Sequence, residues 1–368
     1  MEASVRIGMM LRHFGQPGGI GMYTRNIIAA LLKMDQRNQY LLCYRYPEQL
    51  GGYSRYPNVQ EFVVQAPNKL WWDQIAIPRL AEREHLDLIF NPKLSVPLFT
   101  KCKTTFVMHG AEQFAVPYGF KWHDRMYFTI AERMYCKKAD AIIVMTHTGS
   151  KDIAHYVGAD PNKLRVIPES YNELCQVLDE EQALRIREKH RLPERYILFI
   201  GGLNPIKNLK NILKAYHKIC HSFPHKLVVV GFRRWKYSED LHLISELGLR
   251  DRVFFTGFVP DEDISAVYNL ADVFVFPSLY EGFGMPVLEA MACGCPVITT
   301  DKGCSPEVGG GAAILVNPYD PQQIADAIEK VLTDNELRER LIAKGLIRAS
   351  EFSWDKCARE TLELFESL

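Results

Sequence analysis

The stretch VFVFPSLYEGFGMPVLEAMACGCPVITT, residues 273–300, holds two short apolar runs on either side of a helical pattern. The runs at 273–277 and 296–300 are rich in apolar and β-branched residues, which is typical of parallel strands covered on both faces. Pro286 is expected at the first helical position, after a loop that contains Gly282 and Gly284. The stretch therefore predicts a strand–helix–strand unit of a parallel α/β sheet.

The same alternation repeats along the chain. Strands are expected at 5–10, 40–44, 87–91, 104–108, 141–145 and 164–167, and again at 196–201, 226–231, 252–257, 273–277, 296–300 and 313–316. Helical patterns lie between many of them, at 23–33, 124–138, 209–221, 238–247, 261–270 and 321–332. This order predicts doubly wound, Rossmann-like α/β sheets.

The alternation breaks once, in the polar stretch 169–192. A linker and a surface helix are expected there, followed by a fresh first strand at 196. We therefore predict two domains, residues 1–170 and 171–352, and a further helical pattern at 353–368 that has no strand after it.

Composition excludes several classes of protein. The 368 residues are 47% hydrophobic and 24% charged, as in globular proteins with room for two cores. The 44 basic and 44 acidic residues balance, which argues against a dedicated nucleic-acid binder. Nine scattered cysteines without a C-x-x-C pair indicate reduced thiols of a cytosolic protein. A signal-peptide pattern and an apolar run of 18 residues are both absent from the sequence, so neither secretion nor a membrane span is expected.

Two glutamates are the first candidates for a binding site. Glu281 lies on the glycine-containing loop and Glu289 lies one turn into the following helix, at the strand edge where α/β proteins bind ligands. Carboxylates accept hydrogen bonds from sugar or ribose hydroxyls, while glycines and a helix start let the backbone approach an anion. The spacing alone fits two ordinary surface acids equally well.

The surrounding residues carry a family resemblance. EGFGMPVLEAMACGCPVI, residues 281–298, closely resembles the signature of the retaining glycosyltransferases of family 4, whose hallmark is two glutamates separated by seven residues. The resemblance covers nearly the whole chain and implies the GT-B fold, two Rossmann-like domains facing a cleft. It also implies that domain 171–352 binds the nucleotide sugar, that domain 1–170 binds the acceptor, and that the helix at 353–368 crosses back onto the first domain.

Further segments match the family. GGLNPIKNLKNIL, residues 201–213, looks like its phosphate-binding segment, in which Lys207 would neutralise a diphosphate; a solvated lysine is the alternative. Many relatives carry a basic pair here, whereas this chain has Ile206 before Lys207. Arg233 and Arg234, in VGFRRWKY after the next strand, are the candidates for the missing cation.

In the first half, GQPGGIGMYTRNII, residues 15–28, resembles the glycine-rich loop over the donor phosphates and the acceptor cleft, with Gly18, Gly19 and Gly21 as close-approach positions. A tight turn or a dinucleotide site would suit it as well, although it is not G-x-G-x-x-G. His109 follows a strand where relatives place a histidine beside the donor sugar, but Gly110 replaces the aspartate that many of them have next. A structural histidine is the alternative.

The resemblance also assigns the remaining donor contacts. The backbone of FTGFVP, at Phe258 and Val259, would meet the nucleotide base, although a plain strand-to-helix turn fits too. Gly282, Phe283 and Gly284 would hold the donor sugar together with Glu281, and Glu289 would hold the ribose. Cys293 and Cys295 are expected to be structural.

The function implied is a retaining hexosyltransferase that moves a hexose from GDP-mannose or a UDP-hexose to a hydroxyl of a glycan, a lipid-linked saccharide or a small molecule. Glu281, Lys207 and His109 would be its catalytic residues. Lys207, the loop amides and the helix dipole would stabilise the leaving diphosphate, so neither a metal nor another cofactor is expected. Front-face attack and a covalent intermediate are both open for the mechanism.

Other readings stay open. A nucleotide- or NAD-binding Rossmann protein without transfer activity is the main alternative, followed by a sugar-phosphate synthase, a phosphorylase and an interaction scaffold. Residues 71–80 and 121–138 mix aromatic with basic residues, and some family members dock on membranes through such faces. Amphipathic helices packed on the sheet would give the same pattern. A cytoplasmic protein with peripheral membrane contact is therefore the expected location.

Overall fold

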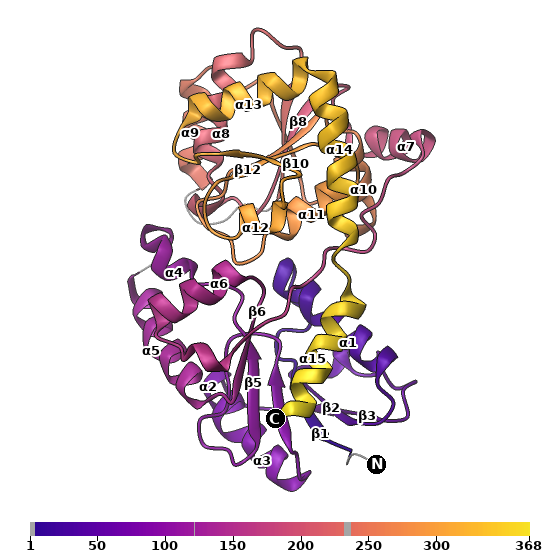
Figure 1. Ribbon diagram of the computed structural model, residues 1–368, viewed down its shortest axis with the longest axis vertical. Helices are drawn as coiled ribbons and strands as arrows, with labels where there is room; N and C mark the ends of the chain where they lie inside the picture. Colours follow the sequence, from indigo (N-terminus) through magenta and orange to yellow (C-terminus); the bar gives the residue numbers. More distant parts are fainter. Residues whose placement is uncertain (1–3, 121, 232–236) are drawn as a thin grey trace. The chain divides into compact units, whose positions relative to one another are not determined.

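The computed structural model describes residues 4–120, 122–231 and 237–368 (Figure 1). The chain forms two compact units, each with its own parallel sheet. The first comprises Met1–Ala115, Phe120–Ser170 and Ser353–Leu368, and the second comprises Val116–Gly119 and Tyr171–Phe352.

The first unit is built on a seven-stranded parallel sheet in the order β3-β2-β1-β4-β5-β6-β7. The strands are β1 (Arg6–Met10), β2 (Gln39–Tyr44), β3 (Val59–Val63), β4 (Leu88–Asn91), β5 (Lys103–Val107), β6 (Ala141–Val144) and β7 (Leu164–Val166). Its helices are α1 (Gly19–Met34), α2 (Lys69–Trp71), α3 (Ile77–Arg83), α4 (Glu112–Ala115), α5 (Trp122–Lys138), α6 (His147–Asp152) and the C-terminal α15 (Trp354–Ser367). Because the strand order reverses between β1 and β4, ligands are expected beyond the carboxyl ends of these two strands.

The C-terminal helix α15 packs against α1 in this unit. The ring centroids of Trp354 and Tyr23 are 5.7 Å apart, and those of Phe365 and Phe90 are 5.1 Å apart. All four side chains are buried, so the last helix contributes directly to the core of the first unit.

The second unit has a six-stranded parallel sheet in the order β10-β9-β8-β11-β12-β13. The strands are β8 (Tyr196–Ile200), β9 (Lys226–Val230), β10 (Val253–Gly257), β11 (Val273–Phe276), β12 (Val297–Thr300) and β13 (Ile314–Val316). Its helices are α7 (Glu180–His190), α8 (Leu209–Ile219), α9 (Tyr237–Glu246), α10 (Asp261–Asn269), α11 (Met285–Ala292), α12 (Ser305–Gly309), α13 (Pro321–Thr333) and α14 (Asn335–Ser350). The order reverses here between β8 and β11.

The predicted α/β architecture is confirmed, and all twelve predicted strands occur with small shifts at their ends. The prediction missed β3, because this edge strand carries polar Gln60 and Glu61 and is only partly buried. It also missed α14, which follows α13 after a single residue, Asp334. Pro286 is the second residue of α11 rather than the first, since Gly284 caps the helix and Met285 begins it.

All nine cysteines are free thiols; eight are buried and Cys102 is partly exposed. Along the described residues, none of the helices combines the length and the apolar character that crossing a bilayer would require.

Candidate functional site

The segment that carries Lys207 is held rigidly at the carboxyl end of β8. Pro205–Lys207 form a single 3-10 turn, capped by the Asn204 side chain, which accepts from the amides of Ile206 and Lys207 at 3.0 and 3.2 Å. Asn208 follows in the left-handed conformation and donates to the carbonyls of Pro277 and Pro318 at 2.9 and 2.7 Å. These bonds tie the Lys207 turn to the loops that follow β11 and β13.

Lys207 and Glu281 meet across the switch point between β8 and β11. The Lys207 Nζ atom lies 2.6 Å from Oε1 of Glu281 and 5.2 Å from the ring centroid of Phe276, the last residue of β11. Their side chains are only 23% and 11% exposed. The readings of Lys207 as a solvated lysine and of Glu281 as a surface acid are therefore wrong, and a partly desolvated ion pair stands where a ligand is expected.

The loop from Glu281 to Gly284 has its own supports. The buried Cys304 thiol lies 3.1 Å from the carbonyl oxygens of both Glu281 and Phe283. Phe283 is buried and packs edge-on against Phe352 at 5.7 Å. Gly284 has φ 93°, a conformation that L side chains rarely adopt, and directly precedes α11. These contacts and the conformation of Gly284 define the backbone path of the loop.

Glu289 lies on α11, as predicted, but it is not a surface acid. Glu289 is 8% exposed, and its carboxylate accepts a hydrogen bond of 3.0 Å from the hydroxyl of Tyr268 on α10. Burial raises the pKa of Glu289 to about 7, because the charged form loses hydration. Within the described part of the chain, no hydrogen bond or ion pair joins Glu289 to Lys207 or Glu281, so the two predicted acids have different partners.

His109 belongs to the first unit, directly beyond β5. Its Nε2 lies 2.8 Å from the carbonyl oxygen of Pro92, and its ring packs edge-on against Tyr23 at 5.1 Å. Burial lowers the pKa of His109 to about 4, so the ring is neutral at pH 7. Because a carbonyl only accepts, Nε2 carries the proton and Nδ1 is left as the acceptor. His109 can thus receive a hydrogen bond from a hydroxyl but does not act as a cation.

The predicted glycine-rich loop runs from β1 into α1. Gly18 has φ 89° and caps α1, and Gly19 is the first residue of that helix. Gly21, the third predicted close-approach position, has no room for a side chain, because a Cβ atom there would lie 1.7 Å from the carbonyl oxygen of Gln16. The loop is therefore a close turn, and Gly18 adds conformational freedom at its last position.

Two other predicted contacts follow the edge strand β10. Phe258 is 56% exposed, whereas Val259 is buried, immediately before α10. Arg233, predicted to contact the donor, lies outside the described residues, as does Arg234.

One Asp-x-Asp sequence, a pattern that can hold a metal, does occur at 261–263, and sequence reasoning overlooked it. Asp263 is 2.6 Å from Nζ of Lys189 and 2.7 Å from Nε2 of His190, so its carboxylate is already engaged in an ion pair with Lys189 and a hydrogen bond with His190, both of α7. Over the described ranges, no group of three His, Cys, Asp or Glu side chains is arranged to hold a metal ion.

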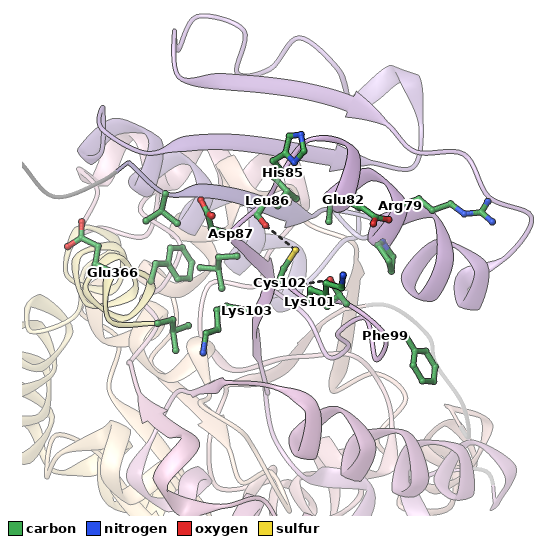
Figure 2. Close-up of a pocket in the computed structure, with 17 residues that line it drawn as sticks. Arg79, Glu82, His85, Leu86, Asp87, Phe99, Lys101, Cys102, Lys103 and Glu366 are labelled. Atoms are coloured by element: carbon green, nitrogen blue, oxygen red, sulfur yellow. Dashed lines mark hydrogen bonds between the residues drawn. The ribbon is translucent and has the colours of Figure 1, made fainter.

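Two cavities lie in the separate units. The second unit has one of 840 Å³ beside the Lys207 turn; its described lining includes Asn204, Asn208, Leu279 and Tyr319 but none of Lys207, Glu281 and Glu289. The first unit has one of 660 Å³ at the amino ends of β4 and β5, where Figure 2 shows Asp87, Lys103 and Glu366 around it. That edge is opposite to the carboxyl ends at which α/β ligands bind.

Sequence reasoning missed several residues that shape the site. Asn204 had a recognisable signal, since an Asn directly before a Pro is a helix-start pattern. Tyr268 and Cys304 had none, because each acts on a residue about twenty positions away in the chain.

Comparisons with known proteins match both halves of the chain to glycosyltransferases. The family model described as Glycosyltransferase Family 4 matches residues 17–172, and the one described as Glycosyl transferases group 1 matches residues 180–347. O-antigen chain mannosyltransferase B of Escherichia coli is 37% identical over 191 residues, covering 51% of this chain and 50% of that protein. The serotype-specific mannosyltransferase WbdA of Escherichia coli is 32% identical over 238 residues, covering 63% of this chain and 29% of that protein.

Solved structures match over the full length of the chain. A sucrose-phosphate synthase of Thermosynechococcus elongatus has a TM-score of 0.78 at 21% identity, covering 99% of this chain and 98% of that one. HepE of Anabaena, solved in complex with UDP and glucose, has a TM-score of 0.77 at 19% identity, covering 99% of this chain and 100% of that one. At these identities the matches show the fold.

The chain spans about half the length of the first mannosyltransferase and less than a third of the second. The two family models nevertheless adjoin and together account for most of its residues. With two Rossmann-like sheets and these structural neighbours, the chain belongs to the glycosyltransferases of family 4, which have the GT-B fold.

Proposed function

We propose that this protein is a retaining glycosyltransferase that moves a hexose from a nucleotide diphosphate sugar to a hydroxyl of its acceptor. The observation that carries the proposal is the Lys207–Glu281 pair at the β8/β11 switch point. A cation beside a carboxylate that accepts hydrogen bonds from hydroxyl groups suits a ligand in which a diphosphate adjoins a sugar. The family match supports the same chemistry.

In this proposal the incoming diphosphate replaces Glu281 as the ion-pair partner of Lys207. Glu281 then accepts hydrogen bonds from the sugar hydroxyls. Lys207 and the amides at the start of α11 stabilise the charge that develops on the leaving diphosphate, without an obligatory metal. Glu289 accepts the ribose hydroxyls beside Tyr268. His109 would accept a hydrogen bond from the donor sugar through Nδ1.

We propose front-face attack for the retaining step. The acceptor oxygen bonds to the anomeric carbon as the bond from that carbon to the diphosphate oxygen breaks, on the same face of the sugar. The released phosphate oxygen takes the acceptor's proton. This route needs no enzyme nucleophile, so Glu281 serves in binding rather than in covalent catalysis.

Mannose is the first sugar to test. The two mannosyltransferases that resemble the chain support an activated mannose, and hence GDP-mannose, as the donor. HepE, a neighbour by fold, was solved with UDP-glucose in another complex, which keeps UDP-hexoses as the second choice.

A thermal-shift panel of GDP-, UDP- and ADP-sugars, run with EDTA, tests the proposal. A donor at about 100 times its Kd should stabilise the fold by about 2.7 kcal/mol. Transfer of a labelled sugar from the stabilising donor to a hydroxyl acceptor should follow. Protection by NAD and by none of the nucleotide sugars would instead identify a dinucleotide-binding protein.

The proposal includes peripheral contact with a membrane at the cytoplasmic face. Trp122, Met126, Ile130 and Met134 follow one another at intervals of four on α5 and are 75%, 55%, 57% and 48% exposed. We call these four residues the α5 stripe. Arg125, Arg133 and Lys137 are exposed on the same helix. An apolar stripe beside cations favours the interface of an anionic bilayer.

The neighbouring helix α2 extends this surface. Lys69 of α2 lies 5.3 Å from the ring centroid of Tyr127 on α5. Leu70 and Trp71, which follow Lys69, are 53% and 49% exposed, whereas Trp72 is buried. The helix α5 buries Ala131 and Tyr135, as a helix packed on the sheet would, while Trp71 and the α5 stripe stay exposed. This exposed apolar surface supports the proposed membrane contact.

The double variant Met126→Glu, Ile130→Glu is expected to bind vesicles of phosphatidylcholine and phosphatidylglycerol at least about tenfold more weakly than the wild type. Each side chain contributes about 1.5–3 kcal/mol when fully buried in an apolar phase. The matched control is Ile347→Glu, which changes a residue 66% exposed in the second unit and should bind like the wild type. Equal co-sedimentation of all three proteins with the vesicles would contradict membrane contact through α5.

A further inference from the structure

The first sheet has a switch point of its own, between β1 and β4, and basic residues follow both strands. Arg12 and His13 come after β1, and Lys93 comes after β4. β1 and β4 are paired neighbours in the sheet, so these side chains leave it at the edge where α/β proteins bind ligands. Lys93 also acts on His109, because burial and the charge of Lys93 together lower the pKa of that ring. The Lys207–Glu281 pair and Glu289 belong to the second unit.

Arg12 is fixed in place by a buried acid. Its Nε lies 3.1 Å from Oδ1 of Asp73, its Nη2 lies 3.4 Å from Oδ2, and the two side chains are 8% and 1% exposed. Asp73 also accepts from the Ser95 hydroxyl at 3.1 Å. The forked pair orients the guanidinium, and Asp73 balances this one positive charge.

The charges around His13 are not balanced in the same way. We use the name cationic cluster for the residues whose positive charges act on His13, namely Arg12, Arg45, Lys69 and Lys93. Burial, followed by these cations, lowers the pKa of His13 to about 3, so the ring is neutral. The described residues place no carboxylate in ion-pair distance of Lys93, whose Nζ donates to the Gln16 amide oxygen at 2.9 Å.

The pKa and the hydrogen-bond partner of Lys93 also bear on what this cluster binds. Burial, followed by the charges of Arg12 and Lys69, lowers the pKa of Lys93 to about 8. Its partner Gln16 lies in the glycine-rich turn before α1. An anion could replace that neutral oxygen and relieve the repulsion between Lys93 and its neighbours.

We propose that the cationic cluster binds the phosphoryl groups of the acceptor, which makes the acceptor a saccharide joined to a phosphate or a diphosphate. This inference rests on the proposed function and names the substrate class of its second site. Asp73 balances the charge of Arg12. The other three members of the cationic cluster leave three positive charges, and these suit a diphosphate better than a single carboxylate. The neutral His13 ring offers an N–H donor to the same group.

Inorganic pyrophosphate is the probe for this site, titrated by calorimetry into the full chain in the presence of saturating GDP and UDP. The nucleotides occupy the diphosphate site of the second unit, so the remaining binding reports the first. Lys93→Gln and Lys69→Gln are each expected to weaken pyrophosphate binding at least about tenfold. Lys93→Arg, which keeps the charge, and Lys101→Gln, at an exposed lysine outside the cluster, should bind like the wild type.

Pyrophosphate binding that is absent in the wild type, or unchanged in both Lys93→Gln and Lys69→Gln, would overturn the inference. Melting curves of the variants show whether each is folded, and GDP and UDP affinity shows whether the second unit is intact. If neither nucleotide binds but pyrophosphate binding still depends on Lys93, the proposed donor fails while the anion site stands.

A second arm separates the two sources of the phosphate. Phosphatidylcholine vesicles with and without a polyprenyl diphosphate are compared for binding of the wild type and of Lys93→Gln. A lipid-linked acceptor predicts extra binding to the diphosphate vesicles that Lys93→Gln loses. A water-soluble sugar phosphate predicts pyrophosphate binding in solution with no preference between the two vesicles. Both outcomes support an anionic acceptor.

Discussion

Replacing Lys207 with alanine is expected to lower kcat/KM for sugar transfer by about 10²–10³, or about 3–4 kcal/mol. Lys207 is held by the Asn204 cap and by the bonds of Asn208, so its charge is already in position when the leaving diphosphate becomes more negative. Steady-state transfer assays with the preferred donor measure the effect. Lys210→Ala, an exposed lysine on α8, is the control and should retain its rate.

The partner residue should respond differently. Glu281→Gln is also expected to lower kcat by about 10² or more, because a carboxylate that holds the sugar hydroxyls is lost. The affinity of Glu281→Gln for the free nucleoside diphosphate, however, should rise. In the wild type Lys207 must first give up its ion pair with Glu281 at 2.6 Å, whereas in the variant that ion pair is absent. Lys207→Ala should lower the same affinity.

These opposite changes distinguish the proposed role from a structural one. If the Lys207–Glu281 pair only stabilised the fold, both variants would melt earlier and would bind the nucleoside diphosphate equally or more weakly. Calorimetric titration of GDP and UDP into each variant, beside its melting curve, decides between the two roles. Wild-type rates in both variants would remove the pair from the mechanism.

The second large effect concerns Glu289→Gln and pH. The pKa of Glu289 is raised to about 7 in the folded chain, above the value of 4.5 expected in an unfolded chain. The folded state therefore holds this proton more tightly, and its stability falls as the pH rises from about 5 to above 7. Ionisation of the buried carboxyl costs the wild type about 3 kcal/mol at pH 8.

Glutamine cannot ionise and keeps the oxygen that accepts from Tyr268. Glu289→Gln should therefore be more stable than the wild type at pH 8, with little difference at pH 5. Denaturant unfolding at both values measures this change. A variant that is less stable than the wild type at pH 8 would show that the carboxylate is the favoured form in the fold.

Donor binding should change in the opposite direction. Ribose hydroxyls donate to the ionised carboxylate, so the wild type should bind the donor up to about tenfold more weakly at pH 6 than at pH 8. Glu289→Gln should bind weakly at both pH values. A donor affinity that is equal at pH 6 and pH 8 in the wild type would exclude Glu289 as the ribose ligand.

The candidate site shows how far local sequence leads. The loop at 281–284 and the place of Glu289 one turn into the helix were predicted, and the start of α11 was predicted to within one residue, because these features depend on residues within a few positions of one another. A glycine with φ 93° and a proline at the helix start act locally. The burial of Glu289 under Tyr268 could not be predicted, since it depends on how α10 packs beside α11.

What the sequence by itself determined is twelve of the parallel strands, many of the helices between them and the residues at the strand ends, because hydrophobic period and turn chemistry are local properties. Only the tertiary structure decided which strand ends are neighbours. Lys207 meets Glu281 across 74 residues, and Arg12 meets Asp73 across 61. Neither pair follows from spacing, because strand order in a sheet depends on how distant segments bury their faces together. That order places one charged site at each switch point of this protein.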